Sequence, residues 1–596
     1  MEAISHIDQL SGSFLSLDLV TAFRQDEALD VARSITPAIS ELLSDPAKSL
    51  VVLGKLFHPD AFWRDHVSLS WSLRTFHPTS VISKKVIPLI QRAEIIPSSI
   101  SLQEEQALAI TFPNGITVVR APFTFETSNP KAQCTVAFKL IRMNNGDVKV
   151  FTVTTAIQEL DAMPWSKVPA EVISVLPSAV PKSLDVLVVG GGHGGLSISA
   201  YLKSLGVNFA MVEKQPTIGD SWGKRYESTT LHTTRMFSGL PFVPFPSDYP
   251  QYVPAKLIAL YYAKYAQDLQ LPAYTGRECV SATWDAAQAQ WIVTLKGSHG
   301  AEVVTARNIV FAVGVGGRWP IIPDFPGRDS FLGESLHSVV YKDASLWAGK
   351  HVAVVGSSTT ACDVAHDCSR AGADIVMVQR GPTRIYPGAH IAAIQAPFWN
   401  EQIPVEVGDV MATEDPIVLQ STLSALVLKT LKDNHDPEYY DGLRRAGFLA
   451  TLEGPVHQQI FCRGGAHYPD IGACGAIARG EIKVKSDAKI ESITPTGIAF
   501  SDGSKLDVDV IVYATGFEKD MRTSIAAIVG TEQATSLEPV WGLDAEGEVR
   551  GCWRPSGNDH IWFQGGELQT MRYYGKFLAI QIAAEIAKVR PTPCRK

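Results

Sequence analysis

The sequence predicts an α/β protein with two Rossmann-type dinucleotide-binding domains, preceded by an α+β domain. Two observations predict the α/β part: continuous apolar runs typical of buried parallel strands, and glycine-rich turns between such a run and a helical pattern. A third predicts the α+β part: a helical pattern near the start precedes strand-like runs that are separated by Pro-Asn-Gly and Asn-Asn-Gly turns.

The composition of the 596-residue chain is that of a globular protein, with 45% hydrophobic and 19% charged residues. Its net charge of −8 disfavours nucleic acid as a partner. None of the eight cysteines forms a CxxC pair, so we expect neither a metal site nor a disulfide framework. No apolar run reaches the roughly 20 residues of a membrane span. We therefore expect a cytoplasmic protein that does not cross a membrane.

The organisation of the chain follows from where these patterns change. Residues 1–175 form the expected α+β domain, and the Pro-containing stretch 172–182 is the expected linker. Within the α+β domain, a helix is predicted over 22–43, and four strands over 107–112, 117–125, 135–141 and 148–157. The two dinucleotide-binding domains are interleaved, with the first at 184–345 and 506–596 and the second at 346–505.

The first glycine turn has the pattern G-x-G-x-x-G at Gly190, Gly192 and Gly195. The first glycine permits a tight turn, the second lets the backbone approach a pyrophosphate, and the third allows close packing of helix on strand. Glu213 ends the next predicted strand, where a carboxylate can bind both ribose hydroxyls. The turn therefore predicts a dinucleotide site that includes the intervening residues Gly191, His193 and Gly194.

The second glycine turn is an altered version of the first. It consists of Gly356, Ser357, Ser358, Thr359, Thr360 and Ala361. Ser358 replaces the middle glycine. Either its hydroxyl binds a phosphate or its Cβ atom holds the ligand away. Arg380 ends the following strand, where an arginine pairs with the 2′-phosphate of NADP and a carboxylate would select NAD. The alternative is that Arg380 is a solvated residue at a strand end.

The segment between the two sites carries a more specific pattern. Phe331-x-Gly333-x-x-x-His337-x-x-x-Tyr341 resembles the fingerprint of class B flavoprotein monooxygenases, the flavin-containing monooxygenase superfamily. Four other segments resemble this family over roughly residues 184–587. They are Gly219-Asp220-Ser221-Trp222, the proline-rich stretch 241–253, Ala514-Thr515-Gly516-Phe517, and IWFQGG with Arg572.

This resemblance implies an oxidoreductase that uses FAD and NADPH. In the family, reduced FAD reacts with dioxygen to give a peroxyflavin, which transfers one oxygen atom to a small organic substrate. It further implies cofactor contacts from Ser221, Trp222, Thr233, Ala514, Thr515 and Gly516.

Two histidines are the candidate catalytic residues. His232 occupies the position of an asparagine beside the flavin in animal members, and Leu231-His232 resembles the plant YUCCA enzymes, which oxidatively decarboxylate an indolic keto acid. His337 belongs to the fingerprint, either as a catalytic residue or as a structural hinge. For His232 the alternative to catalysis is packing over the edge of the flavin.

Three functions stay open at this stage. They are N- or S-oxygenation or oxidative decarboxylation of a keto acid, a Baeyer–Villiger reaction, and uncoupled NADPH oxidation by a degenerate cofactor-binding protein. Tyr341-Lys342 disfavours the Baeyer–Villiger reaction, because that branch usually ends the fingerprint with Trp and then Pro or Asp.

Residues 1–175 are weakly similar to the cone-shaped SnoaL-like family. That similarity implies a cone that Trp63, Arg64, Asp65, His66 and Trp71 either line or support by packing, and a role in homodimer contact or in shielding the active site.

Overall fold

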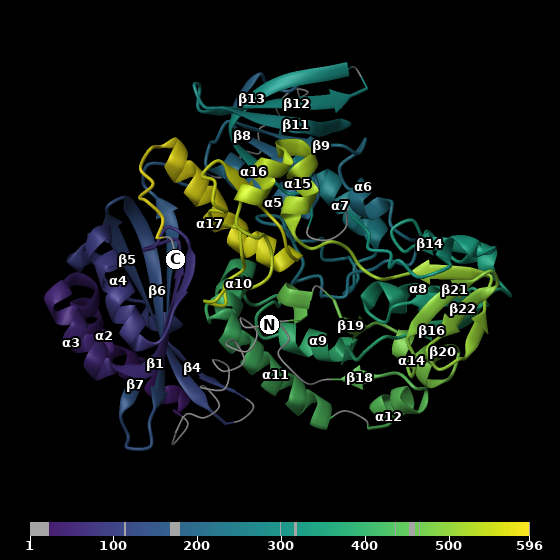
Figure 1. Cartoon of the computed structure of the whole chain (residues 1–596). Coiled ribbons are helices and arrows are strands. Elements are labelled where there is room, and N and C mark those ends of the chain that lie inside the picture. The colour runs from purple at the N-terminus through teal and green to yellow at the C-terminus, as the bar shows by residue number, and fades with distance from the viewer. Residues whose placement is uncertain are drawn as a thin grey trace.

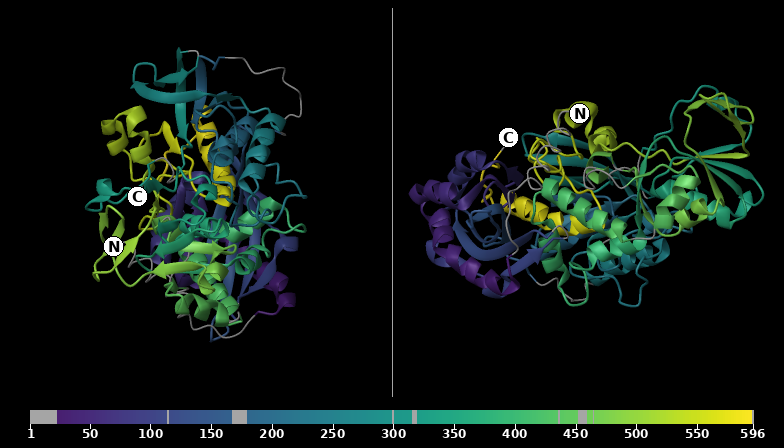
Figure 2. Two further views of the ribbon diagram at one scale, coloured as in Figure 1. Left: turned by 90° about the vertical axis from the view of Figure 1, so that its right-hand side faces the viewer. Right: turned by 90° about the horizontal axis from the view of Figure 1, so that it is seen from below.

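The computed structural model describes residues 23–112, 115–166, 179–298, 300–314, 319–434, 437–451, 459–463 and 465–594. These residues form three parts, and Figures 1 and 2 show the N-terminal domain and the second dinucleotide-binding sheet at opposite ends of the molecule, with helix α17 between them. Most of the predicted linker 172–182 lies outside the described residues. Among the described residues, no helix has the length and apolar character that crossing a membrane requires.

The described part of the N-terminal domain is a seven-stranded sheet with three α-helices. The sheet order is β2-β1-β7-β6-β5-β3, with β4 also paired to β5. Its elements are α2 (Ala28–Ser44), α3 (Pro46–Leu56), β1 (Phe57–His66), β2 (Leu73–Phe76), α4 (Thr79–Ala93), β3 (Ser101–Leu102), β4 (Leu108–Thr111), β5 (Thr117–Ser128), β6 (Lys131–Arg142) and β7 (Val148–Leu160).

The sequence predicted some of these elements and missed others. The four predicted strands correspond to β4, β5, β6 and β7, and the predicted helix over 22–43 begins later, as α2. Strand β1 was missed because it ends in the polar run Arg64-Asp65-His66. All three of these residues are fully buried, because other parts of the molecule cover this end of the sheet. The likeness to the SnoaL-like family stays a prediction.

The first dinucleotide-binding sheet has the order β10-β9-β8-β13-β12-β11, with β25 paired to β13. Strands β8, β9 and β10 run parallel, as their apolar sequences predict, while β11, β12 and β13 form an antiparallel meander. The elements are β8 (Ser183–Val189), α5 (His193–Ser204), β9 (Phe209–Glu213), α6 (Asp220–Gly223), α7 (Ala255–Asp268), β10 (Ala273–Thr275), β11 (Arg277–Asp285), β12 (Gln290–Gly297), β13 (Gly300–Phe311), α15 (Met521–Val529), α16 (Thr531–Ser536), β25 (Ile561–Phe563) and α17 (Leu568–Ile586).

The second dinucleotide-binding sheet is entirely parallel, in the order β14-β24-β15-β16-β20. Its elements are β14 (Glu334–His337), β15 (His351–Val355), α8 (Thr359–Arg370), β16 (Asp374–Val378), α14 (Ala473–Ala478), β20 (Ile482–Lys485) and β24 (Val510–Tyr513). The expected boundaries at 345/346 and 505/506 cut through this sheet, because β14 and β24 pair within it. Strand pairing is a non-local contact that the local pattern does not contain.

The remaining elements join the sheets. They are β17 (Thr383–Pro387), α9 (Gly388–Gln395), α10 (Val405–Thr413), α11 (Ile417–Asp433), α12 (Pro437–Arg445), β18 (Ala450–Thr451), the π-helical turn Gln459–Arg463, β19 (His467–Asp470), β21 (Ile490–Thr494), β22 (Gly497–Phe500) and β23 (Lys505–Asp507). One hydrophobic core runs from the N-terminal domain into the first dinucleotide-binding domain, while the second sheet packs around separate cores.

Candidate active site

The first glycine turn lies at the carboxyl end of β8, where α5 begins. Gly190 has φ +111°, and a Cβ atom there would lie 2.5 Å from the carbonyl oxygen of Ala312. At Gly195 a Cβ atom would lie 1.8 Å from the carbonyl oxygen of Gly190. These two glycines are therefore required by the packing of the turn itself, as the pattern predicts.

Gly192 differs from its neighbours because open space lies beside it. The nearest protein atom to an added Cβ would be Ser221 Oγ, 3.9 Å away. Gly192 is also the N-cap of α5, and no side chain among the described residues caps this helix. An uncapped helix N-terminus with space in front of it suits a phosphate group, so these residues fit the pyrophosphate of a dinucleotide.

Glu213 is held in place by the turn. Its Oε2 accepts a hydrogen bond of 2.6 Å from the backbone N of Gly191, and its Oε1 accepts one of 2.8 Å from the backbone N of Gln215. Each carboxylate oxygen keeps a lone pair for a further donor. The carboxylate is thus oriented at the end of β9, where ribose hydroxyls would reach it.

The other residues predicted at the first site pack around it. Trp222 is buried, and the guanidinium carbon of Arg225 lies 4.2 Å from its ring centroid. His193 Nε2 lies 3.2 Å from the carbonyl oxygen of Gly566, and burial lowers the pKa of His193 to about 4. Gly194 lies against Met571 of α17 and against Gln564, which follows β25, so these two residues close this side of the turn.

The second glycine turn lies at the carboxyl end of β15. Gly356 has φ +133°, and a Cβ atom there would lie 2.5 Å from the carbonyl oxygen of Ala514. The segment Ala514–Gly516 therefore lies against the second turn, because β24 pairs with β15. Thr515 Oγ1 donates a hydrogen bond to the carbonyl oxygen of Ile321, which ties the segment down.

The hydroxyl groups of the second turn are directed toward protein atoms. Ser358 Oγ and Thr359 Oγ1 donate to the carbonyl oxygen of His467, at 2.9 and 3.1 Å, and Ser357 Oγ lies 2.7 Å from Thr383 Oγ1. Ser358 is the N-cap of α8, which no side chain of the described residues caps. Ala361 is buried, as close packing of helix on strand requires, and Thr360 beside it is half-buried.

Arg380 lies two residues after the end of β16 and is exposed. Within the described ranges, no ion pair includes this guanidinium group. Its charge is therefore available to an anion near the second turn.

His232 joins the two dinucleotide-binding domains. Its Nδ1 lies 2.9 Å from the carbonyl oxygen of Pro469 in β19, and its Nε2 lies 3.2 Å from Asp363 Oδ2 in α8. Both partners are acceptors, so both ring nitrogens must donate, and the ring is an imidazolium. Burial lowers the pKa of His232, but the hydrogen bond and charge of Asp363 outweigh that effect and raise it.

His337 is neutral and buried at the end of β14. Its Nδ1 accepts a hydrogen bond of 3.2 Å from the backbone N of Val339, which leaves the proton on Nε2. Burial lowers the pKa of His337, and the backbone of Gly516 partly offsets that effect. The ring packs edge-on against Phe517, 5.1 Å between centroids. Thr233, the remaining predicted contact, has its Oγ1 2.7 Å from Ser238 Oγ.

Comparison with known proteins decides the family. The flavin-binding monooxygenase-like (FMO-like) family matches residues 185–533, which is more than half of the chain. The chain belongs to this family. The protein is therefore a flavin-dependent monooxygenase, as the fingerprint around His337 predicted.

The monooxygenase resembles several curated plant proteins. It is 30% identical over 346 residues to the indole-3-pyruvate monooxygenase YUCCA1 of Oryza sativa subsp. japonica, covering 56% of this chain and 77% of that protein. It is 27% identical over 421 residues to YUCCA8 of Oryza sativa subsp. indica, covering 67% and 90%.

The monooxygenase is also similar to solved structures. For a flavin-containing monooxygenase from Stenotrophomonas maltophilia the TM-score is 0.47 at 18% identity, covering 68% of this chain and 100% of that one. For the OTEMO complex with FAD and NADP the TM-score is 0.46 at 18% identity, covering 68% and 85%.

Glu567 lies close to the first glycine turn and was not predicted from the sequence. It precedes α17 and follows Gly566, whose carbonyl oxygen contacts His193. Desolvation raises the pKa of Glu567 to about 7, although its side chain remains accessible to solvent. Its only signal in the sequence was the resemblance of the preceding IWFQGG to the closing segment of the family.

Proposed function

We propose that this monooxygenase binds FAD at the first glycine turn and NADPH at the second, and transfers one oxygen atom from dioxygen to a small organic substrate. One observation carries the proposal. Two sheets each present a glycine turn at the end of a parallel strand, followed by a helix without a side-chain cap among the described residues. Two such sites in a member of this family suit a flavin and a nicotinamide dinucleotide.

Each nucleotide site has its own selecting residue. At the first, Gly192 and the N-terminus of α5 bind the pyrophosphate, and Glu213 accepts hydrogen bonds from the ribose. At the second, the N-terminus of α8 binds the pyrophosphate and Arg380 pairs with the 2′-phosphate. Bound FAD supplies the oxygen chemistry and bound NADPH supplies the hydride.

His232 serves this reaction by positioning. Asp363 holds the imidazolium and also accepts a 2.7 Å hydrogen bond from Tyr226. Tyr226 and His232 belong to the first dinucleotide-binding domain, and Asp363 belongs to α8 of the second. Their contact therefore fixes one site relative to the other. Hydride transfer between two bound rings depends on such alignment.

The names of the curated relatives point to a substrate class. YUCCA1 and YUCCA8 are named as indole-3-pyruvate monooxygenases. We propose a 2-oxo acid with an aromatic side chain as substrate. The reaction consumes the 2-oxo acid, dioxygen, NADPH and a proton, and yields the acid one carbon shorter, carbon dioxide, NADP⁺ and water. One oxygen atom enters the acid and the other leaves in water.

The test is NADPH consumption in air with and without indole-3-pyruvate, using protein whose flavin content has been measured. We expect about one FAD per chain, faster NADPH consumption with the 2-oxo acid, and carbon dioxide release in step with it. Glu213→Ala, which removes the ribose acceptor, is the control for flavin dependence. Folded protein that cannot take up FAD would contradict the proposal, and unchanged NADPH consumption with every 2-oxo acid tested would remove this substrate class.

A further inference from the structure

The contact between the N-terminal domain and the monooxygenase domains is built from buried charges. Four strands of the N-terminal sheet, β2, β1, β6 and β5, each contribute one cation, and β7 lies between β1 and β6. These cations and the carboxylates that they meet are Arg74 with Glu546, Arg64 with Glu548, Lys139 with Glu414 and Asp415, and Arg120 with Glu414. In these pairs every cation belongs to the N-terminal domain and every carboxylate to the monooxygenase domains, so the paired charges are complementary.

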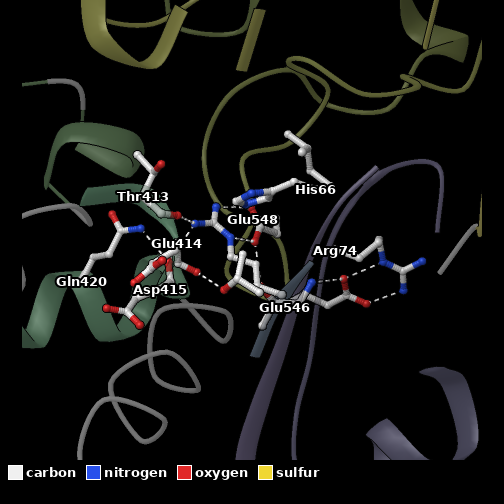
Figure 3. A network of polar contacts seen from close by, with 12 residues as sticks. His66, Arg74, Thr413, Glu414, Asp415, Gln420, Glu546 and Glu548 are labelled. Atoms are coloured by element: carbon white, nitrogen blue, oxygen red, sulfur yellow. Dashed lines mark hydrogen bonds and ion pairs between the residues drawn. The ribbon is translucent and has the colours of Figure 1, made fainter. Parts of the chain in front are cut away.

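The carboxylates come from two separate segments, which Figure 3 shows on the two sides of the network. Glu546 and Glu548 belong to the loop before β25. Glu414 and Asp415 form the joint between α10 and α11, in the helical segment 388–433 that connects the second sheet to the rest. The pairs with Glu546 and Glu548 dock the N-terminal domain, and the pairs with Glu414 and Asp415 hold the joint between α10 and α11.

Arg64 contacts both segments at once. Its Nε and Nη2 donate to the carboxylate of Glu548 at 2.7 and 2.9 Å, while its Nη1 donates to the carbonyl oxygens of Thr413 and Asp415 at 2.6 and 2.8 Å. The side chain is fully buried. A cation at the carboxyl end of α10 is favoured by the helix dipole, and the planar fork sets the direction in which α10 ends.

Through Arg572, helix α10 also reaches the segment that carries His232. Asp409, four residues before Thr413 in α10, accepts two hydrogen bonds of 2.7 Å from Arg572 in α17. Arg572 Nη1 in turn donates to the carbonyl oxygens of Phe237 and Gly239, at 2.9 Å for Phe237. Helix α10 is therefore held by two buried arginines, Arg64 at its carboxyl end and Arg572 at its middle, one from each domain.

We infer that the N-terminal domain is a positioning element for the oxygenation site, and that Arg64 is its positioning residue. By fixing the joint of α10 and α11, Arg64 holds Asp409 against Arg572 and so keeps residues 237–239, and the segment from His232 onward, in place. The inference rests on the proposed function, because it assigns these segments to the pocket in which oxygen is transferred.

The experiment compares two charge-conserving variants of the full chain. In Arg64→Lys, an ammonium group can stay with Glu548 but cannot also reach two carbonyl oxygens. Arg74→Lys is the matched control, since Arg74 docks the same domain through Glu546 and the carbonyl oxygen of Cys594 without touching α10 or α11. The two readouts are amide hydrogen exchange of α10 and α11, and hydrogen peroxide released per NADPH consumed.

We expect Arg64→Lys to speed amide hydrogen exchange in α10 and α11 by about tenfold, because the variant loses one charge-assisted hydrogen bond. It should also release more peroxide per NADPH while flavin content and anaerobic flavin reduction stay near those of the parent protein. Arg74→Lys should change neither readout. Equal effects of the two variants, or no effect of Arg64→Lys, would overturn the inference and leave the network as a docking contact.

Two further outcomes are also decisive. If Arg64→Lys does not accumulate as folded protein, Asp415→Asn removes a partner of Lys139 at the same joint, and the same readouts apply. Parent protein that consumes no NADPH would contradict the proposed function, whereas the exchange rates of α10 and α11 would still decide the role of Arg64.

Discussion

Single residues set the charge of the contact between the two dinucleotide-binding domains. His232 has a raised pKa, so its bond to Asp363 contributes fully below the ordinary histidine pKa and is lost as pH rises through the raised value. Tyr226 and Asp470 face the same group. Burial lowers the pKa of the nearby His467, and the charge of His232 adds to that effect.

We therefore expect His232→Ala to lower the free energy of unfolding by about 1.5–3 kcal/mol at acidic pH and by less at alkaline pH. Urea unfolding of the parent and the variant across pH measures this difference. His351→Ala, which removes an exposed histidine paired with Asp374, is the control and should give little change at any pH. A deficit that is constant with pH would show that His232 is not the charged group.

Arg380 gives a second prediction at this scale. Its exposed guanidinium should contribute roughly 1.5–3 kcal/mol to binding a 2′-phosphate, which is about ten- to a hundredfold in affinity. Arg380→Ala should erase most of the preference for NADPH over NADH in steady-state kinetics. Arg370→Ala, at the far end of α8, should leave the preference intact. Equal use of both coenzymes by the parent protein would contradict the assignment.

At the scale of elements, we expect two glycines of the β8–α5 turn to have different roles: Gly195 is required for folding and Gly192 for FAD binding. Gly195→Ala would place a methyl group 1.8 Å from the carbonyl oxygen of Gly190, so we expect protein that unfolds easily and holds no flavin. Gly192→Ala meets only Ser221 Oγ at 3.9 Å and should fold normally. It should nevertheless weaken FAD binding by on the order of tenfold or more, because the methyl group enters the phosphate approach. Urea midpoints and flavin titration distinguish the two. Parent-like FAD binding by Gly192→Ala would place the phosphate elsewhere.

The predicted elements were those that local sequence determines. The strands β5 to β7 and the glycine turns follow from turn residues and apolar periodicity over about ten residues. Strand β1 did not follow from local sequence, because Arg64 has the character of a surface residue until the fold places Glu548 beside it. The membership of β14 and β24 in the second sheet did not follow either, because strand pairing is a non-local contact.

At the scale of the whole molecule, the buried ion pairs govern how the N-terminal domain is held. Glu548→Ala would leave Arg64 buried without its carboxylate and should reduce the free energy of unfolding by about 3–5 kcal/mol. Glu546→Ala, whose carboxylate is partly exposed, should have a smaller effect. Urea unfolding followed by tryptophan fluorescence measures both. A smaller loss for Glu548→Ala than for Glu546→Ala would contradict the importance of burial.

The sequence by itself determined the two nucleotide-binding turns, because a glycine with positive φ and an apolar strand are properties of a few neighbouring residues. Only the tertiary structure decided the charge of His232 and the roles of Arg64 and Arg572. Arg64 and Glu548 are 484 positions apart, and His232 and Asp363 are 131 apart. A side chain's pKa and burial depend on groups that the fold brings near it, and no local pattern names those groups.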